Sequence, residues 1–407
     1  MSSPRAFHSA PFRNLFFARL LTVLGNGIAP IALAFAVLDI GGSAADLGLV
    51  VAARSLFNVA FLLLGGVLAD RYSRSVVMVS SSLAAALSQG IVAWVVLDGS
   101  ATIPLLAVLG ALNGAAAGIA LPASSAMVPQ TVPVHNLREA NALIQLGVYG
   151  GTVIGASMGG LLTSAIGPGW GLAIDALGFA VAAPLYQRIH VNALLIEKSA
   201  SNMLQDLREG WKEFIVRSWV WAIVAQFTII NAAFSGVVMV LGPIVADGTF
   251  GRTGWGFIVA AQSIGLIIGS LIALRWRPRR DLLIGVVLVA LCAIPMLILG
   301  FWPSTPLLMG AFFLAGVGFG QFGVVWAQSL QTHIPPQKLA RVYAYDAMGS
   351  FVAIPIGEIA AGPLALQFGS PTVLLACACA VVLATLVTTF TPSIRQLDNR
   401  AQLRAHS

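Results

Sequence analysis

Five ionisable side chains stand inside otherwise apolar runs of this sequence: Arg19, Arg54, Asp175, Asp346 and Glu358. A charge surrounded by hydrocarbon is costly, so such residues typically pair with one another, line a wet cavity or relay protons. The sequence has no G-x-x-x-x-G-K-[ST] loop for nucleotide phosphates and no His, Asp or Glu cluster at metal-ligand spacing. These residues therefore indicate ion pairing and proton exchange, with no metal and no other cofactor.

Neutral amides form a second set of polar residues. Asn26, Asn113, Asn231 and Gln321 lie near the middles of four apolar runs, and Gln145, Tyr149 and Gln262 lie in two others. A polar group in hydrocarbon needs a hydrogen-bond partner or a wet cavity. Each amide is therefore expected either to bond a neighbouring helix or to face such a cavity.

One stretch, "GASMG" at Gly155–Gly159, matches the nucleophile pattern G-x-S-x-G. That chemistry needs the serine on a sharp turn between a strand and a helix, with a histidine and an acid nearby. Ser157 instead falls inside a long apolar run, where small residues allow close helix packing. We do not expect an enzyme.

The composition requires membrane helices to position these residues. Of the 407 residues, 58% are hydrophobic and only 9% are charged, and mean hydropathy is +0.90, whereas about a quarter of a soluble domain is charged. Twelve runs approach the roughly 20 apolar residues of a membrane span. Their approximate bounds are 14–38, 46–69, 75–97, 103–126, 139–165, 170–189, 219–246, 254–274, 282–302, 306–330, 341–366 and 371–391. The expected fold class is an all-α polytopic membrane protein with twelve transmembrane helices.

Basic residues predict the orientation of these spans. If both termini are cytoplasmic, the outer loops hold only Arg252 among basic residues, beside Asp39, Asp46, Asp98 and Asp247. Such a bias marks the cytoplasmic side of a multi-pass protein. The basic residues behind the net charge of +7 lie in short loops, so we expect contact with membrane lipid rather than nucleic acid. The three cysteines, Cys292, Cys377 and Cys379, lie in apolar runs and are interpreted as packing residues.

The chain also divides into two similar halves. Pro133, Leu137, Gly147, Gly155, Gly160 and Gly167 recur 202 positions later as Pro335, Leu339, Gly349, Gly357, Gly362 and Gly369. Two six-span repeats with a substrate site between them are typical of secondary transporters. We expect an N-terminal bundle at residues 1–189, a cytoplasmic linker at 190–218 that partly lies on the membrane surface, and a C-terminal bundle with a short cytoplasmic tail at 219–407.

Two motifs resemble those of the major facilitator superfamily. "GGVLADRYSR" is similar to its loop between spans two and three, glycine-x-x-x-aspartate-arginine-x-x-arginine, through Gly66, Asp70, Arg71 and Arg74. Ser73 replaces the glycine usual before the last arginine. "GTVIGASMGG" resembles the antiporter motif of span five through Gly151, Gly155, Gly159 and Gly160, with Ala156 replacing its proline. The resemblance implies two six-helix bundles and, through the span-five motif, export.

Two further stretches, "VLGNGIAPIALAFAVLD" and "PASSAMVPQTVPVHNLREANAL", resemble the bacterial macrolide-efflux and enterobactin-exporter branch. The chain departs from relatives at three positions. Asn26 stands where an acid is frequent, span four has Gly110 and Asn113 in place of an arginine common in drug/proton antiporters, and Glu358 stands where relatives often have an uncharged residue.

The resemblance implies a role for the amides, because spans one, four, seven and ten line the central cavity in this superfamily. Each of these spans carries one of the four mid-span amides, so we interpret them as cavity residues, with Gln145, Tyr149 and Gln262 as further members. The set contains no fixed charge. It therefore predicts a neutral or weakly charged amphipathic substrate, oriented by a few hydrogen bonds against apolar walls.

The resemblance also implies an outer gate. Spans two and eleven face each other in the superfamily, and Arg54 and Glu358 each lie about eight residues, roughly 12 Å, from the outer ends of these spans. We predict that they pair when the outer side is closed and that protonation of Glu358 weakens the pair. The alternative is that each satisfies a different neighbour, and Asp39, Asp46 or Asp175 could hold Arg54.

On the cytoplasmic side we predict a conformational latch that includes Gly66. Asp70 is expected to cap the N-terminus of span eleven, with Arg71 or Arg74 near Asp346. Asp346 could alternatively carry protons. Arg19 either extends to the inner headgroups or lines the cavity.

These interpretations predict a secondary active efflux transporter. It would export small amphipathic compounds (drug, macrolide or siderophore-like) by alternating access as a proton antiporter, with Glu358, then Asp346, then Asp175 as proton site. The alternative is an importer or uncoupled facilitator of a small neutral solute on the same fold. We expect the substrate, protons and lipid as partners, a monomer, and a location in the bacterial plasma (inner) membrane with both termini cytoplasmic.

Overall fold

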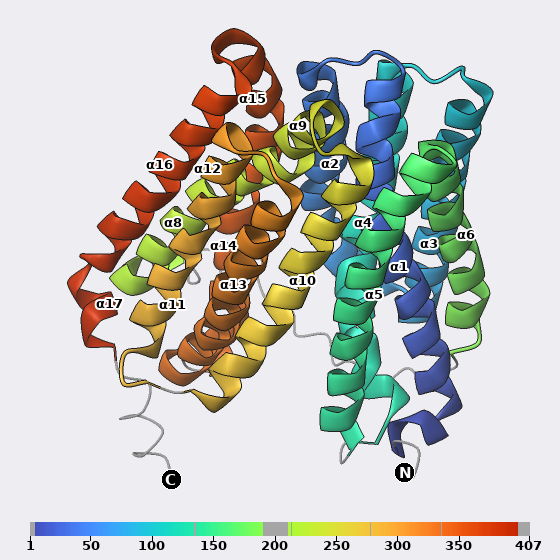
Figure 1. The fold of residues 1–407 in the computed structure, drawn as a ribbon. Helices are drawn as coiled ribbons and strands as arrows, with labels where there is room; N and C mark the ends of the chain where they lie inside the picture. Colours follow the sequence, from blue (N-terminus) through green and yellow to red (C-terminus); the bar gives the residue numbers. More distant parts are fainter. Residues whose placement is uncertain are drawn as a thin grey trace. The chain divides into compact units, whose positions relative to one another are not determined.

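A computed structural model describes residues 5–133, 136–189, 211–212, 214–276, 278–334 and 336–397. Helices make up most of these ranges, and they contain no β-strand (Figure 1). The expected all-α fold class is therefore confirmed.

Twelve helical stretches in the described ranges are long and apolar enough to cross a membrane. They are Ala10–Asp39, Ala44–Leu62, Arg74–Asp98, Ile103–Ser124, Glu139–Ala165, Pro168–Gln187, Ser218–Gly248, Gly251–Arg275, Asp281–Phe301, Thr305–His333, Tyr345–Phe368 and Ser370–Thr389. Each coincides with one of the twelve runs predicted from hydropathy, and only the ends differ by a few residues.

The chain forms two compact units. Unit 1 comprises Met1–Ile196 and Ala246–Ala260, and unit 2 comprises Glu197–Val245 and Ala261–Ser407. The predicted linker at 190–218 lies largely outside the described residues. The grouping of Ala246–Ala260 with unit 1 has no counterpart in the sequence pattern, which places these residues in the second half of the chain.

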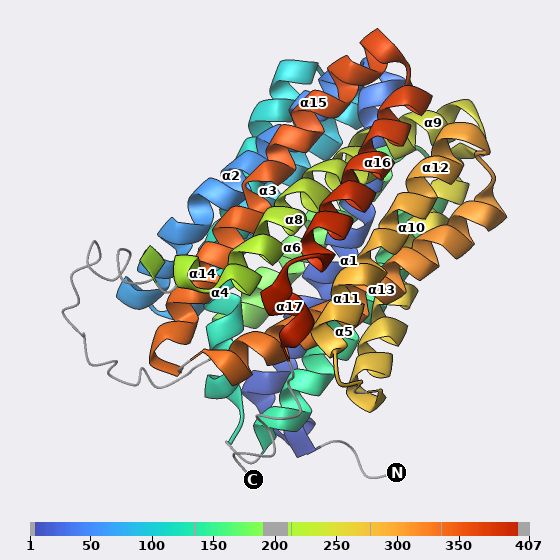
Figure 2. The ribbon, with the colours of Figure 1, turned by 90° about the vertical axis from the view of Figure 1, so that its left-hand side faces the viewer.

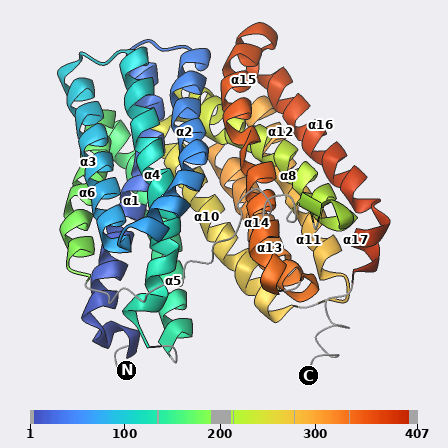
Figure 3. The same cartoon turned by 180° about the vertical axis from the view of Figure 1, so that it is seen from behind.

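Unit 1 contains six long helices. Its elements are η1 (Arg5–His8), α1 (Ala10–Asp39), α2 (Ala44–Arg71), α3 (Arg74–Asp98), α4 (Ile103–Thr131), α5 (Leu137–Ala165) and α6 (Pro168–Gln187). Helix α1 packs on α5 and α6, α2 packs on α4, and α3 packs on α4 and α6 (Figure 3). The first ten residues of α10 (Gly251–Arg275) also belong to this unit.

Polar caps start several of these helices. Ser43 and Asp46 form a capping box at the start of α2, in which the Ser43 backbone amide donates to Oδ2 of Asp46 at 2.8 Å and the Asp46 amide donates to Oγ of Ser43 at 3.2 Å. Ser73 caps α3 by accepting a hydrogen bond from the Val76 amide at 3.3 Å. The serine that replaces the usual glycine of the superfamily loop therefore has a structural role.

Glycines set the close approach of α2 and α4. A methyl group added at Gly114 would collide with the backbone carbonyl of Arg54, and one at Gly118 would collide with the carbonyl of Asn58. Helices whose contact residues lack side chains can pack backbone to backbone. This packing brings Arg54 of α2 against the polar residues of α4.

Unit 2 contains the remaining helices. They are α8 (Ser218–Ser235), η3 (Gly236–Leu241), most of α9 (Gly242–Gly248) and of α10, α11 (Asp281–Val289), η4 (Ala290–Cys292), α12 (Ala293–Phe301), α13 (Thr305–His333), α14 (Pro336–Phe351), α15 (Ala353–Phe368), α16 (Ser370–Thr389) and α17 (Pro392–Gln396). Helix α8 packs on α14, α15 and α16 (Figure 2). Its continuation, η3, is a π-helix, a geometry that is rare and frequently found at functional sites.

Candidate functional site

Arg54 organises a partly buried polar cluster in unit 1. Its Nη2 donates to Oδ1 of Asn26 on α1 at 3.1 Å, and its Nε donates to Oδ1 of Asn113 on α4 at 3.1 Å. Asn26 in turn donates from Nδ2 to the Thr22 carbonyl at 2.9 Å. Two of the predicted cavity amides are therefore joined to a guanidinium, so the amide set includes a fixed positive charge that the sequence pattern did not reveal.

Asp175 lies next to this cluster. The residue is 2% exposed, and its Oδ1 has no hydrogen-bond partner among the described residues. A methyl group at Gly25 of α1 would fall directly on this oxygen, so the glycine makes room for the carboxylate. Arg54 is the cation whose charge acts on Asp175. The pairing of the two, one of the alternatives drawn from the sequence, stays a prediction. Asp46, another alternative, is used in the α2 capping box.

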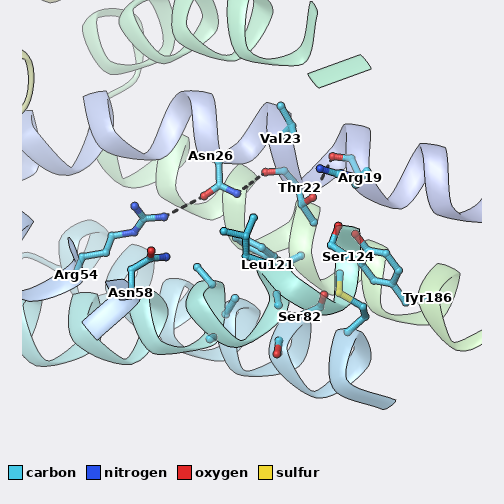
Figure 4. Close-up of a pocket in the computed structure, with 17 residues that line it drawn as sticks. Arg19, Thr22, Val23, Asn26, Arg54, Asn58, Ser82, Leu121, Ser124 and Tyr186 are labelled. Carbon is cyan, nitrogen blue, oxygen red and sulfur yellow. Dashed lines mark hydrogen bonds between the residues drawn. The ribbon is translucent and has the colours of Figure 1, made fainter. Parts of the chain in front are cut away.

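A cavity opens beside Arg54 inside unit 1 (Figure 4). It has a volume of about 280 Å³ and is lined by side chains of α1, α2, α3, α4 and α6. In Figure 4, Arg54 and Asn58 lie at one end, and Arg19, Ser124 and Tyr186 lie at the other. Arg19 therefore lines this cavity, which lies within unit 1. A place for Arg19 in the central cavity of the fold stays a prediction.

In unit 2, Glu358 occupies the most distinctive position. The residue is 1% exposed, and its Oε1 accepts a hydrogen bond from Oγ of Ser235 at 2.6 Å. Ser235 is the last residue of α8 before the π-helix. Gly357 packs against the Ala232 carbonyl, and Gly236 packs against the Gly357 carbonyl. These small residues bring α8 and α15 together and place the carboxylate at the transition from α- to π-helix.

Asp346 is held by partners within unit 2. Its Oδ2 accepts a hydrogen bond from Nε1 of Trp326 at 3.0 Å, and its Oδ1 accepts one from Oγ of Ser350 at 3.4 Å. Asn231 donates from Nδ2 to the Ser350 carbonyl at 2.9 Å. Asp346 and Asn231 therefore meet at the same segment of α14.

The other predicted cavity amides are dispersed. Gln321 is completely buried, and neither of its amide atoms has a hydrogen-bond partner in the described ranges. Because neither atom is bonded, the Gln321 amide remains available to a ligand or a water. Leaving a buried amide unpaired would be costly. Gln262 and Tyr149 are half-buried, and Gln145 is exposed.

Residues 15–358 match the sequence profile of the Major Facilitator Superfamily. The chain belongs to this superfamily. It is 26% identical over 404 residues to the multidrug efflux pump Tap of Mycolicibacterium fortuitum, which covers 95% of this chain and 97% of Tap. It is 30% identical over 270 residues to the enterobactin exporter EntS of Shigella boydii serotype 18, which covers 64% of this chain and 62% of EntS.

Solved structures of superfamily transporters share the fold. A crystal structure of the nucleoside transporter NupG, in a mutant form, matches with a TM-score of 0.77 at 15% identity, over 94% of this chain and 100% of NupG. A bacterial homologue of the lysosomal transporter Spinster matches with a TM-score of 0.76 at 15% identity, over 97% of this chain and 98% of the homologue. The chain is therefore a multi-pass transporter of the major facilitator fold, and its relatives are transporters rather than enzymes.

The span-five motif of the superfamily forms a packing seam. Gly155 contacts the Leu24 carbonyl and Gly27 of α1, and Gly159 contacts Ile28. Gly151 faces Val23 of the same helix, and Gly160 faces the backbone of α10 at Arg252 and Gly256. Three of the four motif glycines therefore approach the backbone of a neighbouring helix, and Gly151 approaches a side chain.

The superfamily loop is described only in part. The end of α2 contains Gly66, Asp70 and Arg71, but the side chains of Asp70 and Arg71 lie outside the described part of the chain. Arg74 begins α3. The latch between this loop and span eleven, including Asp346, stays a prediction, and so does the gate between Arg54 and Glu358.

Sequence reasoning missed part of the unit 1 cluster. Arg19, Thr22 and Asn26 of α1 all line the cavity, and residues three or four positions apart share one helix face. This spacing is the signal that could have grouped Thr22 with Arg19 and Asn26 on one polar face of α1. Ser81 and Tyr186, which also line the cavity, carry no comparable spacing signal.

A second feature missed from the sequence is an ion cluster in unit 1. Arg252 donates from Nε to Oδ1 of Asp247 at 2.9 Å and from Nη1 to Oδ2 of Asp39 at 2.9 Å. Its guanidinium also lies 4.9 Å from the ring centroid of Phe35. The sequence shows Arg252 as the isolated basic residue among acids, but it does not show that two of those acids bind it.

Proposed function

We propose that this transporter exports small amphipathic compounds in exchange for protons and that Glu358 is the residue that binds the proton. The observation that carries the proposal is the buried carboxylate of Glu358 bonded to Ser235 at 2.6 Å, where α8 passes into a π-helix. Buried intramembrane acids typically mark ion or proton pathways. Asp346 is a weaker candidate because it is only half-buried.

Export is supported by the relatives. Tap is a multidrug efflux pump similar over nearly the whole length of this chain, and EntS is an exporter similar over 64% of it. The glycine seam between α5 and α1 corresponds to the superfamily's antiporter motif. These observations favour efflux over the alternative of an importer or uncoupled facilitator.

An amphipathic substrate is supported by the aromatic residues of unit 2. Phe227 of α8 stacks on Phe322 of α13 with ring centroids 4.4 Å apart, and Phe234 contacts Phe319 edge to face at 5.2 Å. Phe227, Phe234 and Phe319 are only half-buried. Aromatic walls with a few polar groups are typical of sites for small organic ligands, and the Asn231 amide on α8 supplies one such polar group.

The proposed coupling follows from the chemistry of the Glu358 carboxylate. The ionised form only accepts hydrogen bonds, whereas the protonated form also donates one, so proton binding changes the set of hydrogen bonds that Glu358 can make. Two six-helix bundles of this fold alternate between inward and outward access. A proton drives that exchange only if it binds the two states with different affinity.

Transport into proteoliposomes under an imposed pH gradient tests the proposal. A fluorescent amphipathic dye and a panel of antibiotics serve as substrates for the wild type, for Glu358→Gln and for Glu139→Gln. The last is a matched control, because Glu139 lies in the first turn of α5 and accepts a bond from the Ala6 amide. We expect Glu358→Gln to lose gradient-driven transport at least tenfold while retaining exchange without a gradient, and Glu139→Gln to resemble the wild type.

Two outcomes would contradict the proposal. Substrate movement by the wild type that ignores the pH gradient would indicate a facilitator. Gradient-driven transport by Glu358→Gln at the wild-type rate would exclude Glu358 as the proton site and would direct attention to Asp175, a second buried acid.

A further inference from the structure

The cavity inside unit 1 is small, is lined by side chains of five helices and has polar groups at both ends (Figure 4). Its volume of about 280 Å³ is near the lower limit of small-molecule pockets, which span about 300–1,000 Å³. Arg54 lines one end and Arg19 lines the other. Asn26, the bonding partner of Arg54, lies seven positions after Arg19. This offset corresponds to roughly 10 Å along α1.

The charges around this cavity do not balance. No carboxylate is among the described residues that line it. The Arg54 guanidinium bonds neutral amide oxygens of Asn26 and Asn113, and Asp175 is its acidic neighbour. Within the described part of the chain, the Arg19 guanidinium makes no hydrogen bond or ion pair, and the phenol of Tyr186 is the titratable group that interacts with it. A cation inside a membrane protein without a compensating anion is costly.

Hydrogen-bond donors surround the same space. Ser81 is 5% exposed, lines the cavity and has an Oγ with no hydrogen-bond partner in the described residues. Ser82 and Ser124 are also buried and line the cavity. Ser124 lies at the Arg19 end of the cavity (Figure 4). Hydroxyl groups together with a guanidinium form the donor set that carboxylates and similar anions require.

The remaining wall is apolar. Phe179, Ala85 and Ala116 line the cavity and pack together as one cluster. We propose that this cavity binds an amphipathic organic anion, with its acidic group at Arg19 and Ser81 and its apolar body against the Phe179 cluster. The inference rests on the proposed function and narrows its amphipathic substrates to anionic ones, in place of the neutral or weakly charged substrate that the sequence predicts, because a neutral compound would leave Arg19 without a counter-charge.

Equilibrium dialysis of the full-length protein in phosphatidylcholine nanodiscs tests this proposal without requiring transport. The probes are 1-naphthoate and 1-naphthamide, which share a ring system and differ in charge. We expect the wild type to bind naphthoate at least tenfold more tightly than naphthamide, and Arg19→Gln to remove that preference. Arg13→Gln is the matched control, because Arg13 lies on the same helix but is exposed and bonds the Phe7 carbonyl.

A second variant separates binding from folding. Ser81→Ala removes a hydroxyl that has no hydrogen-bond partner within the described ranges, so the variant is expected to fold with an unchanged melting temperature and to bind naphthoate several-fold more weakly. Equal affinity of the wild type for the two probes, no binding of naphthoate, or an unchanged preference in Arg19→Gln would each overturn the proposal.

The source of the anion is decided by adding phosphatidylglycerol to the nanodiscs. Competition with naphthoate would identify a lipid headgroup as the resident anion, and no competition would identify a solute. Failure of the dialysis experiment while gradient-driven export persists would reject the anion site and leave the proposed function intact. Retention of naphthoate binding without gradient-driven transport would reject the function alone.

Discussion

At the scale of single residues, the contact between Gly25 and Asp175 controls how α1 meets α6. We expect Gly25→Ala to lower the stability of the protein by about 1–3 kcal/mol, which is typical of overpacking, because the added methyl would fall on the carboxylate and on the Asp175 backbone. Thermal unfolding in detergent measures the change. Gly90→Ala on α3 is the control, since its nearest new neighbour is the Ala176 Cβ at 4.0 Å. An equal change in melting temperature in both variants would show that the methyl at Gly25 does not disturb the contact with Asp175.

For single residues, the sequence predicts which side chains need partners but does not predict the partners themselves. Charge within apolar runs singles out Arg54 and Asp175 as residues that are expected to have partners. Their partners depend on helix packing, which the sequence does not contain. Asn26 and Asn113 therefore look like free cavity amides in the sequence, whereas both accept hydrogen bonds from one guanidinium.

At the scale of helices, the seam between α5 and α1 depends on glycine. A methyl at Gly155 would meet the Leu24 carbonyl and Gly27, so Gly155→Ala is expected to cost about 1–3 kcal/mol and to lower the transport rate. Gly150→Ala on the same helix meets nothing within 4 Å and is expected to keep or slightly raise the melting temperature, because alanine favours helix by about 1 kcal/mol. If Gly155→Ala behaved like Gly150→Ala, the seam would be unimportant.

Helix positions were largely predictable because hydropathy alone marks a span of about 20 residues. The π-helix at Gly236–Leu241 was not predictable, since its residues are as apolar as those of an α-helical span. The role of Ser73 as the N-cap of α3 was also hidden, because the superfamily pattern presents that position only as a missing glycine.

At the scale of the whole molecule, the predicted orientation can be tested with single cysteines. Ser100 lies between α3 and α4, and Tyr72 lies between α2 and α3, and both are exposed. We expect a membrane-impermeant thiol reagent to label Ser100→Cys in intact cells and to label Tyr72→Cys only after permeabilisation. The reverse pattern would place the termini outside, and the parent chain, with Cys292, Cys377 and Cys379 in its spans, supplies the background.

The two-part organisation was partly visible in the repeated prolines and glycines of the halves. The membership of Ala246–Ala260 in unit 1 was not, because it depends on contacts such as those of Gly256 with Gly160 and of Arg252 with Asp39. Such contacts join positions far apart in the chain, and composition and periodicity report only on neighbours in sequence.

The π-helix in span seven also affects how this chain must be aligned with others. A π-turn accommodates about one residue more than an α-turn, and each α-helical residue rotates the side-chain direction by about 100°. Residues after Leu241 therefore point about 100° away from where an uninterrupted α-helix would aim them. Alignment with a relative whose span seven is α-helical throughout requires a one-residue gap within Gly236–Leu241. Without that gap, every residue from Gly242 to Gly248 would be assigned to the wrong face of the helix.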